Sequence, residues 1–409
     1  MGKNILIEAL RNNEKSSYLF ESNSTFIAYK TGFPALDYNM GFIVNVFDDK
    51  GELISTYPAI GITAGSIICV IGKTHVGKTT FAIEAASNIV RPFNNGMVLH
   101  YDLEGGTNMT RISTVSRISP LDINGGKYIL RQSGSSIEEI KMTIAKIYSE
   151  KINNPKKYQY DTGVTDEFGR PIIAYEPTCI IIDSVPSLST FINENTKDGQ
   201  KALEEITTQT DKMRLTAEIG RFLVESMQMM KASNIIMFLI NHIKEKPGMG
   251  VPQAPELRFL RQNETLPAGK ALQYYTNTMI RLTSIGSEKY SLTEHGFDGF
   301  GVSAQFIKNR SNADGTIVPL VFDKVKGYDS IRSSIMLAKD FGLLGGNKNG
   351  YYFINNKDKK FRFDDVHNAF NNDRELYKIM YDHIIPVLKD SLSSVKPEEL
   401  IVNEEEMDY

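Results

Sequence analysis

The segment from Gly72 to Thr79 reads Gly-Lys-Thr-His-Val-Gly-Lys-Thr and follows directly on an apolar run at 66–71. A strand that ends in a glycine-rich turn and opens a helix forms a cradle of backbone N–H groups. The helix N-terminus adds partial positive charge at the same place. A helical pattern does follow, starting at Phe81. The spacing therefore predicts a phosphate-binding loop and a chain that binds a nucleoside triphosphate.

The residue types in this loop have separate chemical roles. Lys78 can reach the β- and γ-phosphates, and the Thr79 hydroxyl can hold Mg²⁺. The alternative is a glycine-punctuated strand–helix turn with a surface lysine. The residues expected to surround the phosphates are consecutive: Gly72, Lys73, Thr74, His75, Val76, Gly77, Lys78, Thr79 and Thr80.

The composition is that of an ordinary globular protein. With 409 residues, 41% hydrophobic and 23% charged, the chain is long enough for one large α/β domain with smaller appendages. The formal net charge of −3 argues against a protein that holds nucleic acid by overall positive charge. It does not exclude a local basic groove, because binding depends on the patch and not on the sum.

The cysteine and histidine residues limit the kinds of site that the chain can contain. Cys69 and Cys179 both fall in apolar strand runs, so they are interpreted as buried hydrophobic residues in a chain from a reducing compartment. The six histidines are dispersed without ligand spacing, so no zinc site is predicted. No apolar run approaches the ~20 residues that span a bilayer, and no secretory segment is found at the N-terminus. No membrane partner is expected.

Beyond the loop, apolar strands alternate with helical patterns. Strands are expected at 96–101, 179–183 and 234–241, and helices at 137–151 and 217–231. Uninterrupted apolar strands between helices indicate a mainly parallel sheet that is covered on both faces, so the predicted fold class is α/β. Later strands, expected at 278–282 and 302–307, extend the sheet and include antiparallel edges.

Other segments interrupt or follow this core. Polar stretches at 189–216 and 244–266 are long enough to be functional loops. Surface hairpins are expected at 47–57 and within 153–175. After a glycine-rich segment that ends at Gly346, a small C-terminal module is expected. It has an aromatic strand at 351–353 and helices within 364–392, and an acidic, disordered tail closes the chain.

Carboxylates follow two of the predicted strands. Asp183 ends one of them, at the edge of an α/β sheet where ligands bind, so it can hold Mg²⁺. An Asp in that position can also cap the next helix. Glu104 stands just past the end of another strand, where it can orient and deprotonate water in line with a γ-phosphate. Asp102 is interpreted as structural.

These motifs occur in the order seen in RecA-type DNA recombinases, and the chain resembles that family over about residues 25–385. The matching segments are 31–37, 72–80, 102–104, 181–185, 240–243, 269–275, 306–310 and 338–344. His242 stands where bacterial RecA has glutamine, which resembles the phage UvsX branch. The hairpin at 45–58, the insertion at 153–175 and a longer first loop depart from the family pattern.

The resemblance implies an architecture. It consists of an N-terminal oligomerisation segment at 1–30, a RecA-like P-loop NTPase core at 31–345, a small α+β C-terminal module at 346–395 and an acidic tail at 396–409. It also implies ATP with Mg²⁺ as cofactors and the cytoplasm of a bacterial or phage-infected cell as the location.

The resemblance implies an activity as well. The protein would form helical filaments on single-stranded DNA, pair it with homologous duplex and exchange strands, with DNA-stimulated ATP hydrolysis. Its N-terminal segment would dock on the neighbouring subunit. A single-strand-binding protein and a loading mediator are further candidate partners. Two alternatives stay open: a hexameric DNA helicase with the same ATPase core, and a recombination mediator that does not exchange strands.

In this family two loops line the filament axis and hold DNA, which gives the two polar stretches a purpose. In the second loop, cations would track phosphates while Met249 and Phe259 wedge between bases. On composition alone this stretch is a solvated loop. The candidate DNA-binding residues are Lys244, Lys246, Met249, Arg258, Phe259 and Arg261.

Four further residues take roles from the resemblance. His242 would sense the γ-phosphate, where a lone histidine is otherwise a core residue with one hydrogen bond. Arg111 would lie against the adenine, although exposed helix arginines are common. Lys308 and Arg310, at i and i+2 of a strand, would reach the neighbouring subunit's γ-phosphate as an arginine finger does. In an arbitrary protein such a pair is simply solvated charge on an edge strand.

Overall fold

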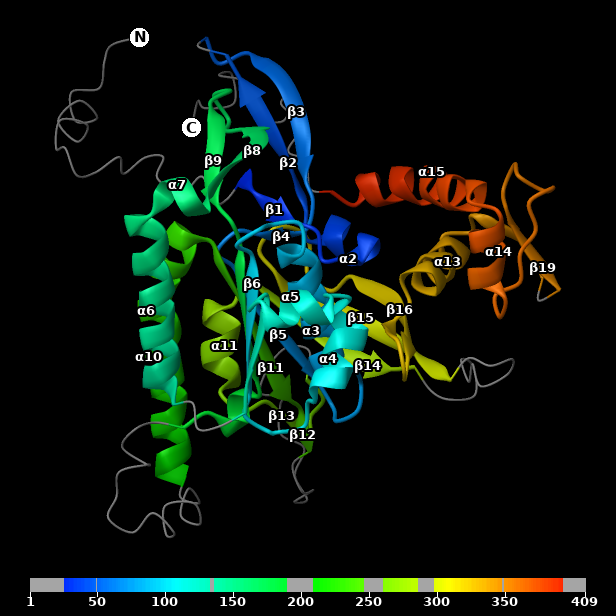
Figure 1. Ribbon diagram of the computed structural model, residues 1–409. Helices are drawn as coiled ribbons and strands as arrows, with labels where there is room; N and C mark the ends of the chain where they lie inside the picture. The colour runs from blue at the N-terminus through cyan, green and yellow to red at the C-terminus, as the bar shows by residue number, and fades with distance from the viewer. Residues whose placement is uncertain are drawn as a thin grey trace, which may run out of the picture.

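In the computed structural model the chain forms a mixed α/β fold around one nine-stranded sheet (Figure 1). The structure describes residues 26–48, 50–132, 136–189, 209–245, 260–285, 298–347 and 349–392. The strand order is β17-β16-β15-β14-β5-β11-β10-β6-β7. These strands are β5 (Ile67–Gly72), β6 (Met97–Asp102), β7 (Tyr128–Arg131), β10 (Thr178–Asp183), β11 (Ile235–His242), β14 (Thr278–Ser284), β15 (Gly299–Asn309), β16 (Ile317–Asp323) and β17 (Gly327–Tyr328).

Six neighbouring strands, from β14 to β7, run parallel. The other three, β15, β16 and β17, are antiparallel to their neighbours. Strands β5 and β10 are buried along their whole length, as expected for a parallel sheet covered on both faces. The predicted mainly parallel sheet with antiparallel edge strands is confirmed.

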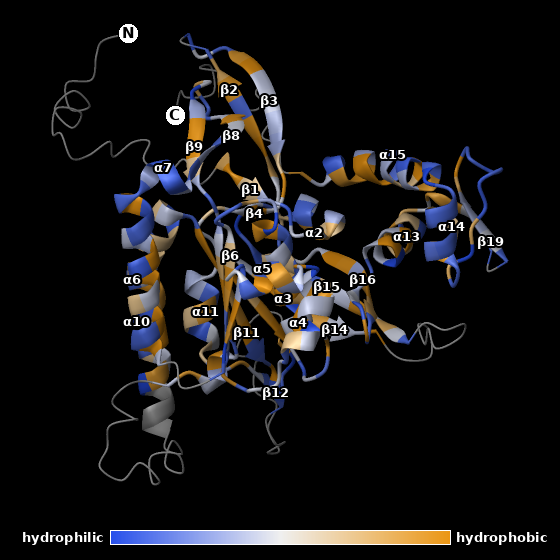
Figure 2. Ribbon diagram, viewed as in Figure 1, coloured by the Kyte–Doolittle hydropathy of each residue, from blue (hydrophilic) through white to orange (hydrophobic). Residues whose placement is uncertain are grey.

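Successive side chains of the strands point alternately into two apolar layers, one on each face of the sheet. In β5, Ile68 and Val70 join the layer that contains α3, while Ile67, Cys69 and Ile71 join the layer of α6, α10 and α11. Figure 2 shows hydrophobic residues concentrated on the central strands and hydrophilic ones on the outer helices. The main helices are α2 (Pro34–Asn39), α3 (Lys78–Val90), α4 (Met109–Ser116), α5 (Pro120–Asn124), α6 (Ile137–Asn153), α10 (Gln209–Ser233), α11 (Gly269–Tyr275) and α13 (Ser330–Asp340).

Helix α6 is defined at both ends by side chains. Ser136 and Glu139 form a capping box, in which each side chain accepts the other residue's backbone N–H. At the opposite end the buried Lys151 ammonium donates to the carbonyls of Glu176 at 2.7 Å and of Ser233 at 2.8 Å. Because Ser233 ends α10, this lysine holds the two long helices together.

Both predicted surface hairpins are present, and they bond to each other. One consists of β2 (Phe42–Phe47) and β3 (Leu53–Ala59), the other of β8 (Gln159–Thr165) and β9 (Pro171–Tyr175). The Phe47 N–H donates to the Glu167 carbonyl at 2.8 Å, and the Tyr57 hydroxyl donates to the Thr165 carbonyl at 2.5 Å. The two predicted hairpins therefore form one structural unit. Nearby, β1 (Ala28–Tyr29) pairs with β4 (Ile62–Thr63).

The prediction of a polar loop through residue 216 is wrong at its C-terminal end, because α10 already begins at Gln209. The apolar face of this helix extends back to Leu215, four residues before the buried Ile219. The two ends of the second stretch pair as β12 (Lys244–Glu245) and β13 (Glu264–Thr265). The remaining parts of both stretches, 190–208 and 246–259, lie outside the described residues.

The C-terminal module contains β18 (Leu344–Asn347), β19 (Gly350–Phe353), α14 (Val366–Asn372) and α15 (Glu375–Asp390), which confirms the predicted aromatic strand and helical region. Arg332 of α13 ties it to the core through the carbonyls of Phe363 at 3.3 Å and Asp364 at 2.9 Å. The acidic tail and most of the 1–30 segment lie outside the described residues. Within the described residues, no helix combines the length and apolar character needed to cross a membrane.

A buried carboxyl group joins α3 to the far edge of the sheet. Glu84 is 5% exposed, and its side chain accepts the Tyr328 N–H at 2.6 Å. A Cβ added to Gly327 would collide with the same carboxyl oxygen. Burial raises the pKa of Glu84 to about 8, although the Tyr328 N–H and the nearby Arg117 oppose the increase.

The pKa of Glu84 predicts a pH-dependent stability. An unfolded glutamate titrates near ~4.3, so the unfolded chain loses this proton first as the pH rises. The stabilising contribution is present below that value and is lost progressively up to about pH 8. Between pH 5 and 8 the folding equilibrium constant of wild type should therefore fall by at least about tenfold more than that of Glu84→Gln.

The measurement is urea unfolding across that pH range, with the exposed Glu52→Gln as the matched control. The control should follow wild type. Parallel pH profiles for wild type and Glu84→Gln would show that the folded chain holds Glu84 ionised.

Candidate phosphate and metal site

The carboxyl ends of β5, β11, β10 and β6 meet at one edge of the sheet, the edge at which β12 and β13 lie in Figure 1. The pairing register places His242 beside Gly72, and Asp102 beside Asp183. Because parallel neighbours end at the same edge, the loop after β5 shares this edge with residues from three other strands.

The loop at 73–77 turns into α3 through left-handed backbone at His75 (φ 63°) and Gly77 (φ 87°). The Lys78 ammonium folds back across the loop and donates to the Lys73 carbonyl at 2.6 Å. Lys78 is only 4% exposed. Burial lowers its pKa to about 8, although the carboxylates of Asp183 and Glu104 oppose the decrease. The loop thus combines the α3 N-terminus with a desolvated cation, as an anion site requires.

Asp183 lies next to the first turn of α3. Its Oδ2 accepts the Thr79 hydroxyl at 2.6 Å. Burial raises the pKa of Asp183 to about 6 despite this hydrogen bond, and the carboxylates of Glu104 and Asp102 add to the increase. A hydroxyl and a carboxylate are the ligands that Mg²⁺ prefers, and a cation here would offset the crowded negative charge. Thr79 and Asp183 therefore fit the predicted metal role.

Glu104 and His242 are brought together from two different strands. The Glu104 Oε1 lies 3.1 Å from the His242 Nε2 and also accepts the Ser184 hydroxyl. Burial and the Lys78 ammonium lower the pKa of His242, while Glu104 opposes that shift. Glu104, Asp183 and His242 each offer a ligand atom within 4.8 Å of the others. Sequence spacing showed no histidine cluster, and only the fold places one histidine beside two carboxylates.

Asp102 has the hydrogen bonds expected of a structural residue. It is 1% exposed and accepts the N–H groups of Gly106 at 3.3 Å and Thr107 at 2.8 Å, and the Gln132 amide at 2.9 Å. Burial alone would raise the pKa of Asp102, but these donors hold it below the usual value. Its carboxylate thereby shapes the turn that carries Glu104.

A cavity of about 230 Å³ lies beside the candidate metal ligands Thr79 and Asp183. Arg111 lies on it, yet its guanidinium already donates to the carbonyls of Lys324 at 3.0 Å and Val325 at 2.5 Å, and to the Thr80 hydroxyl at 3.3 Å. Arg111 is thus placed with the phosphate loop, and its contact with adenine stays a prediction. The cavity is lined by Thr79, Thr80, Ile83, Asp102, Glu104, Gly106, Thr107, Arg111 and Asp183.

Lys308 and Arg310 lie on one face, as their spacing predicts. Both reach the Tyr274 carbonyl at the end of α11, Lys308 at 3.2 Å and Arg310 at 2.9 Å, and Lys308 also reaches the Gln273 carbonyl at 2.5 Å. Burial and Arg310 lower the pKa of Lys308 to about 8. Within the described part of the chain, their hydrogen bonds go to α11 and not to the phosphate loop. The role of Lys308 and Arg310 at a neighbouring subunit's γ-phosphate stays a prediction.

Of the six candidate DNA-binding residues, only Lys244 and Arg261 fall among the described residues. Lys244 is exposed in β12, and the Arg261 N–H donates to Glu264, which pairs with the buried Arg281 at 2.8 Å. The other four, Lys246, Met249, Arg258 and Phe259, lie outside the described residues.

Several partners of these groups are not predicted by the sequence. Lys73 of the phosphate loop forms an ion pair with Glu245 of β12, and Ser184 bonds to Glu104. Neither pair has a sequence signal, because each joins segments far apart in the chain. A third, His100, could have been noticed, since strand alternation puts it on the same face of β6 as Asp102.

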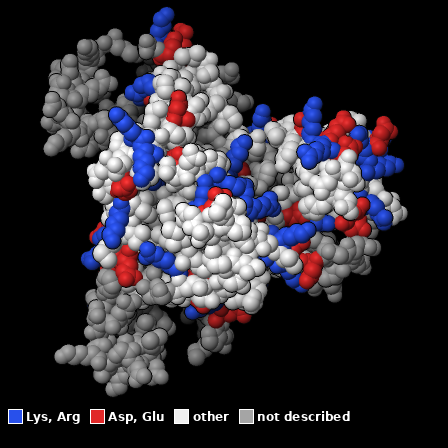
Figure 3. Space-filling view, in the orientation of Figure 1, with Lys and Arg blue, Asp and Glu red and all other residues white. Residues whose placement is uncertain are grey.

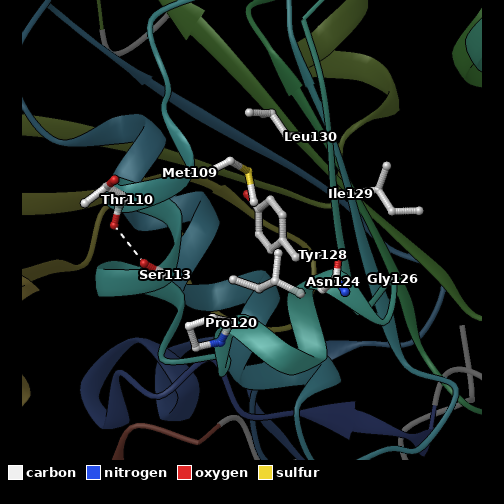
Figure 4. A pocket seen from close by; sticks show the side chains of 10 residues that line it. Met109, Thr110, Ser113, Pro120, Asn124, Gly126, Tyr128, Ile129 and Leu130 are labelled. Carbon is white, nitrogen blue, oxygen red and sulfur yellow. Dashed lines mark hydrogen bonds between the residues drawn. The ribbon is translucent and has the colours of Figure 1, made fainter.

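A larger pocket, of about 690 Å³, lies between α4, α5 and β7, the last strand of the sheet (Figure 4). Basic and acidic side chains are interspersed over the face shown in Figure 3, and the area over α4 and α5 carries few of them. The pocket is lined by Met109, Thr110, Ser113, Pro120, Ile123, Asn124, Gly126, Tyr128, Ile129 and Leu130.

The chain matches none of the protein-family models, and a search of curated proteins returns no match.

The packing beneath the loop gives a prediction for Gly77. A Cβ on this residue would lie 2.7 Å from the Tyr328 hydroxyl, and the Tyr328 ring is held between Phe33, Phe81 and Phe322. A non-glycine residue in left-handed backbone costs about 1–2 kcal/mol on its own. Gly77→Ala should cost that amount plus roughly 1 kcal/mol for the overpacked ring.

Gly315→Ala is the matched control, because Gly315 has φ 91° and no atom within 4 Å of the added Cβ. Urea unfolding of both variants measures the difference. Equal losses of stability would mean that the loop moves away from Tyr328 at no cost.

Proposed function

We propose that this protein is a RecA-type DNA recombinase that polymerises on single-stranded DNA and exchanges strands with homologous duplex, with ATP hydrolysis. The contact of 3.1 Å between Glu104 and His242 carries the proposal. It joins the carboxylate beside the phosphate loop to the end of β11, which continues into β12 and the predicted DNA loop. A nucleotide site with a link of this kind is suited to DNA-dependent ATP turnover.

The proposed roles at the nucleotide follow from burial and hydrogen bonding. The triphosphate would lie in the loop after β5, against Lys78 and the N-terminus of α3. Thr79 and Asp183 would hold Mg²⁺, which neutralises charge on the phosphates when bound. Glu104 is the exposed carboxylate of the group and lines the 230 Å³ cavity, so it can orient and deprotonate a water there.

Coupling to DNA would use two contacts, one between Glu104 and His242 and one between Lys73 and Glu245. His242 shares Glu104 with the hydrolytic site, so a change at the phosphates alters what its imidazole can contact. The Lys73–Glu245 ion pair joins the phosphate loop to the first residues of the second loop. Both contacts would be rearranged together when nucleotide binds, which is how a two-state element responds to a ligand.

Filament formation has support at the edge of the sheet. The pocket at α4, α5 and β7 lies beneath a surface with few charges, and β7 is the last strand in the order. The part of the predicted 1–30 segment that precedes residue 26 would dock there from a neighbouring subunit, because Ala28 and Tyr29 already pair with β4 of their own subunit. Lys308 and Arg310 would act across the same assembly, on the neighbour's γ-phosphate. The proposed location is the cytoplasm of a bacterial or phage-infected cell, with a single-strand-binding protein and a loading mediator as further partners.

Electron microscopy and a strand-exchange assay test this function together. Helical filaments with ATP and single-stranded DNA, and exchange with homologous but not heterologous duplex, would support it. Closed rings that unwind duplex would favour a hexameric helicase. Nucleotide binding without turnover would favour a mediator that does not exchange strands.

Glu104→Gln separates hydrolysis from assembly. The amide keeps the shape of the side chain but cannot accept the water's proton, so turnover should fall by about 10²–10⁴-fold. Nucleotide binding should persist, and ATP-bound filaments should outlast those of wild type in a disassembly assay. In Lys78→Ala, by contrast, nucleotide binding itself should weaken. If the Glu104→Gln filament disassembled at the wild-type rate, Glu104 would not be the base.

A further inference from the structure

His100 stands out among the buried polar groups of the sheet. It lies on β6 with 0% of its surface exposed, and its Nδ1 is 2.9 Å from the Tyr128 hydroxyl on β7. Its Nε2 has no hydrogen-bond partner among the residues that the structure describes, and it lies 4.0 Å from the Asp183 Oδ2. A fully buried nitrogen without a partner is costly, so its position beside a candidate metal ligand needs an explanation.

The surrounding groups determine which nitrogen carries the proton. A tyrosine hydroxyl is protonated near pH 7, so Tyr128 can donate to Nδ1 of His100. If Tyr128 donates to Nδ1, the ring proton is on Nε2 and faces an acceptor. In the opposite tautomer a lone pair would face the Asp183 carboxylate, which is repulsive.

We propose that His100 is a positioning residue for Asp183, with Tyr128 selecting the tautomer that directs the Nε2–H at the carboxylate. The inference deepens the proposed ATPase site and rests on it for the role of Asp183. Thr79 and His100 both approach Oδ2, which leaves Oδ1 as the oxygen for a divalent cation. Groups behind a metal ligand orient it in this way and tune its affinity.

The 4.0 Å separation is longer than a hydrogen bond. An N–H···O bond spans about 2.9 Å, so closing the gap requires a movement of about 1 Å. The χ2 torsion of an aspartate has a broad minimum, so the Asp183 carboxylate can rotate toward His100. His100 would then act as a second fixed donor that favours one orientation of Asp183.

Tyr128→Phe is the decisive variant. It removes only the hydroxyl and keeps the ring that lines the pocket at α4, α5 and β7, as Figure 4 shows. Tyr101→Phe is the matched control, because Tyr101 is the neighbouring buried tyrosine and packs in the layer on the other face of the sheet.

The first measurement needs neither nucleotide nor activity. Nitrogen NMR of histidine-labelled, nucleotide-free protein should show the Nε2–H tautomer for His100 in wild type and in Tyr101→Phe. Tyr128→Phe should give a mixture of tautomers or the Nδ1–H form. A wild-type ring protonated on Nδ1, or a tautomer that Tyr128→Phe leaves unchanged, would overturn the inference.

The second measurement is the Mg²⁺ concentration that gives half-maximal ATP hydrolysis. Tyr128→Phe should require about tenfold more Mg²⁺ than wild type, and Tyr101→Phe should not. His100→Gln, which keeps an N–H donor, should retain more of the wild-type Mg²⁺ affinity than His100→Leu. Wild-type Mg²⁺ dependence in Tyr128→Phe, with hydrolysis intact, would overturn the inference and leave the proposed function standing. Absence of hydrolysis in wild type would overturn the proposed function, and the tautomer measurement would still decide the role of His100.

Discussion

The hydrogen bond of 2.6 Å from the Thr79 hydroxyl to Asp183 is the interaction about which the candidate site is arranged. It ties the first turn of α3 to the end of β10, two strands away from β5 in the sheet. Lys78 precedes Thr79 and is held across the loop. Glu104 and His242 approach Asp183 from the strands on either side. If this contact were lost, the phosphate loop and the carboxylates would no longer share one geometry.

Burial explains why the site is suited to a charged ligand. Lys78 and Asp183 are both 4% exposed. Desolvation lowers the pKa of Lys78 and raises the pKa of Asp183, so it favours the neutral form of each side chain. Phosphate oxygens would stabilise the charged ammonium, and a divalent cation would stabilise the charged carboxylate, so each ligand favours the charged form of the group that binds it. His100 behind Asp183 would add a second donor to the carboxylate.

The same edge of the sheet gives a physical route from nucleotide to the second loop. His242 ends β11 and contacts Glu104, and the pairing of β12 with β13 brings together the two ends of the predicted DNA loop. Glu264 of β13 is in turn anchored by Arg281 of β14. The base of that loop is therefore attached to the same sheet that carries the phosphate loop, so a change at one is mechanically connected with the other.

The sequence by itself determined the strand–loop–helix at 66–90, the mainly parallel sheet and the residue types at its carboxyl edge, because apolar runs and glycine spacing are local signals. It also located both hairpins and the C-terminal module. It placed the start of α10 too late, because a short apolar face at Leu215 was hidden among polar residues. Only the tertiary structure decided which side chains meet. The Glu104–His242 contact, the Lys73–Glu245 pair and the Tyr128–His100–Asp183 alignment each join different strands or loops, and their distances depend on strand order and register, which no local pattern specifies.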